Sequence, residues 1–393
     1  FAGALTTAAQ SAFTGYEDMR LSSITMILQS ILKTTLSPIL IVLGLGALGA
    51  IVGATLGSLT AGLISIALLY IAIYRYLDKS NDGKLKTLEN TKTMFKYGLP
   101  LSISAILSGF STQFYSFLMA IYCTDQTIGN YQVALNFSVL ITFFAVPITT
   151  ILFPAFSKLD AKKESETLRT ASQASVKYAS LLAIPATATI MALSQPAIYT
   201  LFGDKYTIAP LYLALYSITY LYTALGSLSL ANLLNSQGET KATLKFTLLT
   251  TVIEIPLSLI LIPSLGITGL IATTLISGVP SIVMELLLIK TKYGATIDWP
   301  SSAKILAASA IAGATAYLFT SQLSLESWIK LTIGVTLFLI TYTILIPLIG
   351  AINRTDIQNL REMQKELGPI SHISTPVLDI IEKLTYFTNR AQQ

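Results

Sequence analysis

Apolar runs of about 20 residues recur along almost the whole chain, separated by short polar connections. A helix of about 20 residues crosses a hydrocarbon core ~30 Å thick, so this pattern predicts membrane-spanning helices. Because the chain opens with Phe1 and not with Met, we expect earlier helices to precede it, and residues 1–14 resemble the end of one. We expect ten full spans, at residues 22–43, 49–73, 97–121, 128–152, 178–200, 208–232, 245–264, 267–289, 302–320 and 328–349.

The composition agrees with a polytopic membrane protein. Hydrophobic residues make up 53% of the 393 positions, charged residues 11%, and the mean hydropathy is +0.66, which is outside the range of soluble globular chains. The chain has one cysteine, Cys123, and one histidine, His372. One of each excludes an internal disulfide and argues against a zinc site or a Cys/His catalytic site, so we expect neither a metal nor another cofactor.

The basic residues predict the orientation of the chain, because cytoplasmic loops retain Lys and Arg. When the connections are taken alternately from the one around Arg20, one set holds 22 of the 25 basic residues and the other only Lys205 and Lys330, with Lys33 inside a helix. The first set is expected to be cytoplasmic, with the C-terminus on the same side. The net charge of +5 is then spread over several inner loops, which favours anionic membrane lipids over nucleic acid as the partner.

An internal repeat indicates the architecture. The stretch LGLGALGAIVGATLG (43–57) resembles PSLGITGLIATTLIS (263–277), and Gly46 and Gly49 match Gly266 and Gly269 at an offset of 220 residues. Upstream, at an offset of 221, Lys33 matches Glu254. The repeat predicts an all-α membrane protein of two six-helix lobes in parallel repeat, an arrangement found among transporters. The first lobe is expected to be truncated at its N-terminal side.

This architecture divides the chain into five parts. Their expected bounds are 1–73 for the remainder of the first lobe, 74–96 for a cytoplasmic linker, 97–290 for the second six-helix lobe, 302–349 for two additional helices and 350–393 for a cytoplasmic amphipathic tail.

Glu254 lies near the middle of an oily run, TLLTTVIEIPLSLILIP. A charge facing lipid there would cost about 2.5–3.5 kcal/mol, so the side chain should face protein or a watery cavity. Pro256 leaves the carbonyl of Val252 without its helical partner, which suits a helix hinge or a cation site and also suits plain helix packing. Helical spacing groups six polar residues on one face with Glu254 among them: Thr243, Thr247, Thr250, Thr251, Glu254 and Ser258.

Several stretches resemble the polysaccharide flippases of the multidrug/oligosaccharidyl-lipid/polysaccharide exporter superfamily. Residues 95–137, with Gly98-Leu-Pro100 and Gly129-x-Tyr131, are similar to the seventh and eighth helices of that family, as is PITTILFPAFSKL at 147–159. LLNSQGETK at 233–241 is similar to the end of its tenth helix. The resemblance covers essentially the whole chain, through the order of short motifs.

The resemblance implies a multi-pass plasma-membrane flippase that moves polyprenyl-linked sugars by alternating access, and no enzyme activity. In this family the cavity can be basic enough to hold the lipid pyrophosphate, and the visible basic candidate is Lys33. The helices that resemble cavity-lining ones offer Gln113, Gln132 and Asn136, either for sugar contact or for interhelical hydrogen bonds. A hydroxyl stripe on the first of them has the same two readings, close helix contact or sugar contact: Ser104, Ser108, Ser111 and Tyr115.

Two other functions remain as alternatives. A cation-coupled small-molecule exporter of the same superfamily would use Glu254 as its ion or proton site. A membrane glycan polymerase would need a large extramembrane loop with clustered acids or His, and the expected outer loops are only several residues long. Whether Lys33 and Glu254 pair is open.

Overall fold

A computed structural model describes residues 2–76, 87–159, 164–366 and 378–384, and no β-strand occurs among them. The expected all-α fold is confirmed. Shorter helical turns lie at Ile41–Leu45, Tyr74–Tyr76 and Ile218–Leu225. The helices are α1 Ala2–Gly15, α2 Met19–Leu40, α3 Gly46–Ala72, α4 Thr87–Tyr122, α5 Asp125–Ser157, α6 Ser165–Ala192, α7 Ser194–Phe202, α8 Ala209–Ser217, α9 Ser227–Ser236, α10 Thr240–Leu265, α11 Ile267–Tyr293, α12 Trp299–Ser321, α13 Ser327–Leu348 and α14 Arg354–Glu366.

Several of these helices could cross a membrane. By length and composition six of the described helices qualify, or seven if the bent pair Ala209–Leu225 and Ser227–Ser236 is one span. One of the six, Met19–Ala72, contains two of the expected spans. Large apolar side chains on it are exposed, Val42 to 85% and Leu43 to 71%, as expected for a surface that faces lipid. The multi-pass character is confirmed, and the number of ten spans stays a prediction.

The chain separates into two compact units, Phe1–Lys92 and Thr93–Gln393. In the first unit α1, α2 and α3 pack against one another, and Ala9, Phe13 and Ala61 are completely buried. The boundary between the units falls inside the expected linker 74–96. The division into lobes and tail stays a prediction.

The repeated glycines have the same backbone conformation in both units. Gly46 begins α3 with φ 51° and ψ −132°, and Gly266 precedes α11 with φ 60° and ψ −134°. A positive φ favours glycine because it has no Cβ. The two matched stretches therefore turn one helix into the next in the same way, as the repeat predicts.

The other matched glycines, Gly49 and Gly269, each let the two helices of a hairpin come into backbone contact. The hairpins are α2–α3 and α10–α11. A Cβ on Gly49 would lie 2.7 Å from the carbonyl oxygen of Leu40, and one on Gly269 would lie 2.0 Å from that of Leu261. Leu40 and Leu261 are themselves related by the upstream offset of 221 residues. The hairpins α2–α3 and α10–α11 thus share a close backbone contact at equivalent positions.

Gly269→Ala is expected to destabilise the α10–α11 hairpin by about 1–3 kcal/mol, because backbone atoms must move to admit the new Cβ. Gly278→Ala on the same helix is the control, since its Cβ would meet only the Tyr222 ring at an ordinary 3.5 Å. Thermal unfolding of the detergent-purified protein measures the difference. Equal unfolding midpoints for the two variants would contradict the close contact.

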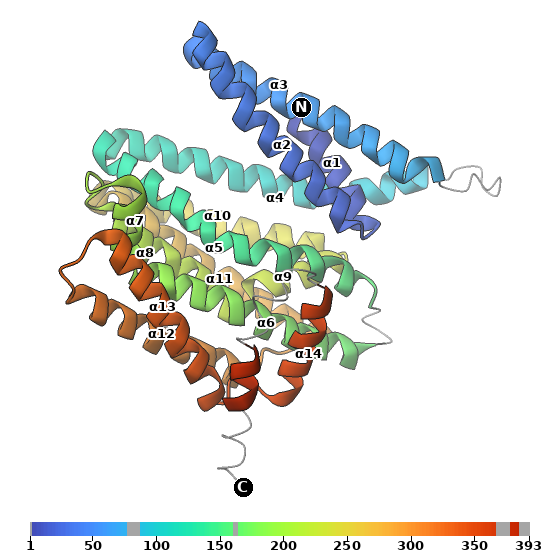
Figure 1. The fold of residues 1–393 in the computed structure, drawn as a ribbon. Helices are drawn as coiled ribbons and strands as arrows, with labels where there is room; N and C mark the ends of the chain where they lie inside the picture. The colour runs from blue at the N-terminus through green and yellow to red at the C-terminus, as the bar shows by residue number, and fades with distance from the viewer. Residues whose placement is uncertain (1, 77–86, 160–163, 367–377, 385–393) are drawn as a thin grey trace. The chain divides into compact units, whose positions relative to one another are not determined.

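In the second unit, α5, α7, α8 and α11 enclose a core that contains Tyr131, Phe137, Ile198 and Leu213. Beside it α12 and α13 pack on each other, and α12 also packs along α6 (Figure 1). A second core, with Ile305 of α12 and Ile346 of α13, joins these helices to α6.

The C-terminal segment folds back onto this second core. Ile357 of α14 and Ile381 of the helix 378–384 are buried in it, whereas Ile380 is 49% exposed. The amphipathic pattern expected for the tail thus packs in part against the protein itself. Leu367, another of its apolar positions, lies outside the described residues.

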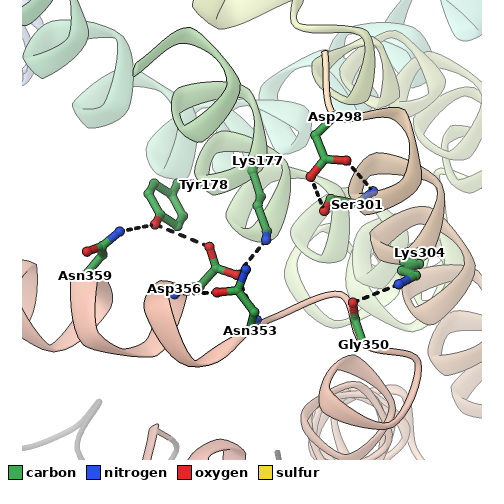
Figure 2. Close-up of polar contacts among 9 residues, drawn as sticks. All are labelled: Lys177, Tyr178, Asp298, Ser301, Lys304, Gly350, Asn353, Asp356 and Asn359. Atoms are coloured by element: carbon green, nitrogen blue, oxygen red, sulfur yellow. Dashed lines mark hydrogen bonds and ion pairs between the residues drawn. The ribbon is translucent and has the colours of Figure 1, made fainter. Parts of the chain in front are cut away.

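A buried ion pair ties α14 to α6. Figure 2 shows Lys177 and Asp356 pointing toward each other, with Nζ 2.5 Å from Oδ2 and the two side chains only 11% and 9% exposed. Asp356 also accepts the Tyr178 hydroxyl at 3.5 Å and the Asn353 backbone N–H at 2.8 Å. Asn359 donates to the Tyr178 hydroxyl at 2.9 Å. We call these five residues the C-terminal clasp.

Exposed charges hold the rest of the segment. Arg361 pairs with Asp379 at 2.7 Å and with Glu382, which connects α14 to the helix 378–384. Hydrogen bonds from the guanidinium to Glu382 and Asp379 raise the pKa of Arg361. Nearby, Lys304 Nζ donates to the Gly350 carbonyl at 3.0 Å (Figure 2).

Candidate functional site

Polar side chains from three helices of the second unit, with an alanine from a fourth, line a cavity of about 380 Å³. It lies among α4, α9, α10 and α11, and its described lining holds two carboxylates and nine hydroxyl groups but no Lys or Arg. The lining residues are Ser108, Ser111, Thr112, Tyr115, Ala231, Thr243, Phe246, Thr247, Thr250, Thr251, Glu254, Ser281 and Glu285. We call it the acidic cavity.

The polar face expected on α10 is the α10 wall of this cavity. Five of its six residues line the cavity, and the sixth, Ser258, is completely buried. Glu254 is 8% exposed, so its expected orientation away from lipid is observed. Its role in transport stays a prediction.

Glu254 is joined to α4 by a hydrogen bond across the cavity. The Tyr115 hydroxyl donates to Glu254 Oε2 at 3.2 Å. Ser111, one turn earlier on α4, is 5% exposed and its Oγ has no hydrogen-bond partner among the described residues. The stripe that contains Ser108, Ser111 and Tyr115 therefore faces the acidic cavity, where unused hydroxyl groups can meet a ligand.

Glu285 is the second carboxylate of the cavity, and the sequence analysis did not single it out. It lies one turn after Ser281 on α11, whose Oγ is 2.6 Å from the Thr250 hydroxyl of α10 and donates to the Phe246 carbonyl at 3.0 Å. The signal was present in the sequence: Ser277, Ser281 and Glu285 recur every four residues within an apolar span, which places them on one helix face.

The two carboxylates lie within expected spans, and the described lining has no basic residue to pair with them. Carboxylate and hydroxyl oxygens are ligands for hard cations, and a carboxylate can also bind a proton. Within the described part of the chain no three Asp, Glu, His or Cys side chains converge. The arrangement can therefore accept a proton or a cation.

The three amides expected to line the central cavity do not belong to the acidic cavity. Gln113 of α4 and Gln132 and Asn136 of α5 are exposed, do not line the acidic cavity, and make no hydrogen bond to any described residue. Another amide of α5, Asn130, forms hydrogen bonds to a different helix and is 2% exposed. Its Oδ1 accepts the backbone N–H groups of Ile208 and Ala209 at 3.2 and 3.0 Å and so supports the start of α8. Sugar contact by the three amides stays a prediction.

Lys33 belongs to the other compact unit. It is half-buried on α2, and its backbone lies close to Gly57 of α3, where an added Cβ would be 3.0 Å from Lys33 N. Its pairing with Glu254 stays a prediction.

Pro256 lies inside α10, which runs without a break from Thr240 to Leu265. Its role as a hinge stays a prediction. The break that the structure records in this unit is at Gly226, where Ala209–Leu225 and Ser227–Ser236 meet at 54°. The sequence analysis treated 208–232 as one continuous span.

Comparisons with known proteins find family models and a relative that match parts of the chain. A family model described as polysaccharide biosynthesis protein matches residues 1–160, and the model called MatE matches residues 100–260. The probable low-salt glycan biosynthesis flippase Agl15 of Haloferax volcanii is 24% identical over 291 residues. That match covers 72% of this chain and 59% of the relative, so the chain spans under two thirds of the relative's length.

Solved structures share the fold. The lipid II flippase MurJ in an inward closed conformation matches with a TM-score of 0.58 and 19% identity, over 83% of this chain and 66% of that one. A MATE protein in the straight conformation matches with a TM-score of 0.56 and 20% identity, over 74% of this chain and 66% of that one. The two family models and the relative thus support the resemblance to the polysaccharide flippases of the multidrug/oligosaccharidyl-lipid/polysaccharide exporter superfamily.

Proposed function

We propose that the protein translocates lipid-linked oligosaccharide or polysaccharide repeat units across the plasma membrane, without chemical conversion of the substrate. The observation that carries this proposal is the match to a probable glycan biosynthesis flippase over 72% of the chain. The basic inner loops support an orientation with the C-terminus in the cytoplasm.

The acidic cavity supports a polar, sugar-like cargo. Nine hydroxyl side chains in its lining can both donate and accept hydrogen bonds, as the hydroxyl groups of a sugar do. The diphosphate of a lipid-linked sugar would be repelled by Glu254 and Glu285, so it must be neutralised outside this cavity. Lys33 of the first unit is the basic candidate. Alternating access between the two units would then expose the cargo to each side of the membrane in turn.

The experiment is deletion of the full-length gene, in a strain without a second flippase gene, followed by an assay of surface glycan. We expect the glycan to be lost and a plasmid-borne wild-type gene to restore it. Unchanged surface glycan after deletion would rule the proposal out.

A cation-coupled small-molecule exporter is the second candidate. It is favoured by the MatE match over residues 100–260 and by the paired carboxylates of the acidic cavity, which can bind a cation or protons. Drug-efflux assays of the wild-type protein and a Glu254→Gln variant decide between the exporter and the flippase. Resistance that depends on Glu254, with normal surface glycan in the deletion strain, would favour the exporter.

A further inference from the structure

The segment 209–236 crosses the second unit in three pieces. Helix α8 gives way to an eight-residue 3-10 segment, Ile218–Leu225, and the short helix α9 follows after Gly226. Runs of 3-10 helix longer than three or four residues are uncommon and often mark a hinge. Gly226 has φ 81° and ψ 11°, and a Cβ there would lie 2.8 Å from the Leu230 side chain. The break thus has a backbone conformation that glycine alone adopts without strain.

The other end of α9 carries Asn235, which connects two walls of the acidic cavity. The Tyr97 hydroxyl of α4 donates to the Asn235 backbone carbonyl at 3.0 Å. The Thr243 hydroxyl of α10 donates to Asn235 Oδ1 at 2.7 Å. Thr243 is itself part of the cavity lining, as is Ala231, one turn before Asn235 on α9. The chain Tyr97–Asn235–Thr243 therefore closes the end of the cavity at which α9 turns into α10.

Side-chain hydrogen bonds link helix α4 to α9 and α10. Tyr97 binds Asn235 and Tyr115 binds Glu254, and between these bonds the acidic cavity lies between α4 and α10. Both bonds of the Asn235 chain join neutral groups, which exchange readily with water. They can break and re-form during a cycle without leaving a buried charge behind.

We propose that α9 is a latch on the acidic cavity, with Asn235 as the positioning residue that holds α4 against α10 and Gly226 as the joint on which the latch turns. The inference rests on the proposed function, in which the cavity must open and close. When the latch is closed, Tyr97 and Thr243 are held together. When α9 rotates at Gly226, Asn235 leaves both hydroxyl groups and this end of the cavity opens.

The test is a distance measurement by double electron–electron resonance on the purified full chain in lipid nanodiscs. Spin labels are attached at Phe95→Cys on α4 and Leu248→Cys on α10, both exposed positions. Cys123→Ser removes the single native cysteine. We expect Tyr97→Phe, which removes the α4 bond, and Asn235→Ala, which removes the α10 bond, to shift the distance distribution to longer values and broaden it.

Matched controls isolate the latch. Asn232→Ala changes the same residue type on the same helix, but the Asn232 amide donates to Leu228 within α9. Tyr122→Phe makes the same change at the exposed opposite end of α4. Gly226→Ala should shift the distribution because it displaces α9 as a whole. Its control is Gly294→Ala, because Gly294 is also left-handed, with φ 63° and ψ 4°, and has no atom within 4 Å of the added Cβ.

The outcomes separate the latch from the proposed function, because the distance needs no substrate. Distributions that are identical for Tyr97→Phe, Asn235→Ala and their controls, in variants that elute and melt as wild type, would overturn the latch. The latch would also be overturned if the distance distributions of the controls shift as far as those of the latch variants. A shifted distance in the latch variants alone supports the latch, whether or not the deletion strain retains its surface glycan.

Discussion

Glu254→Gln is expected to reduce transport by at least about tenfold, a change in activation free energy of about 1.4 kcal/mol, while the protein still folds. Gln has nearly the volume of Glu, and its amide oxygen can still accept the Tyr115 hydroxyl. What it cannot do is carry a charge that a proton or cation neutralises. The loss therefore reports the carboxylate as a coupling group and not as a packing group.

The measurement is restoration of surface glycan in the deletion strain, followed by flux of lipid-linked glycan in proteoliposomes under imposed proton and sodium gradients. Tyr115→Phe is the matched control, because it keeps both carboxylates and removes one hydrogen bond. We expect it to cost about 0.5–1.5 kcal/mol, a loss of roughly two- to tenfold. Wild-type flux in the Glu254→Gln protein would show that the carboxylate is structural.

Glu285→Gln gives the complementary result. If the two carboxylates of the acidic cavity share one proton or cation, either substitution removes the shared site. We expect both single variants and the double variant to lose flux to the same extent. Additive losses would instead mean that the two side chains act independently.

Asp356→Ala is expected to lower the free energy of unfolding by about 3–5 kcal/mol, because it leaves the ammonium group of Lys177 buried without its partner. Lys177 and Asp356 are 11% and 9% exposed, so water does not replace the lost carboxylate. The substitution also removes the acceptor for the Asn353 backbone N–H at the start of α14. Thermal or denaturant unfolding in detergent measures the effect.

Two further variants test whether loss of the Lys177–Asp356 ion pair causes this destabilisation. Asp379→Ala removes an exposed partner of Arg361, with side chains 47% and 40% exposed, and should cost under about 1 kcal/mol. The double variant Lys177→Met with Asp356→Leu should recover most of the stability lost in Asp356→Ala, since apolar pairs replace buried ion pairs well. A double variant no more stable than Asp356→Ala would refute the ion pair as the cause.

The fold class and one wall of the cavity follow from the sequence because both are local properties. Apolar run length indicates spanning helices, the matched glycines indicate the repeated hairpin, and helical spacing places Thr247 and Glu254 on one face. None of these patterns indicates which helix packs against the polar face of α10. The Tyr115–Glu254 bond joins residues 139 positions apart and the Lys177–Asp356 pair residues 179 apart, and such contacts depend on tertiary packing that periodicity does not contain.

Residue type alone does not show which polar side chains share a site. Gln113, Gln132 and Asn136 are exposed and do not line the acidic cavity, so sugar contact by them stays a prediction. For the hydroxyl stripe of α4, helix contact and sugar contact were both expected alternatives, and hydroxyl residues make up most of the residues that line the acidic cavity. A Ser or Thr in a spanning helix can satisfy its hydroxyl on its own backbone, so its presence in the sequence does not reveal whether it also faces a cavity.

The close backbone contact at Gly269 has a mechanical consequence. Because α11 lies directly against the carbonyl of Leu261, the two helices cannot slide past each other at this point without a steric clash. A movement of either helix near the Gly266 turn would therefore carry its partner with it.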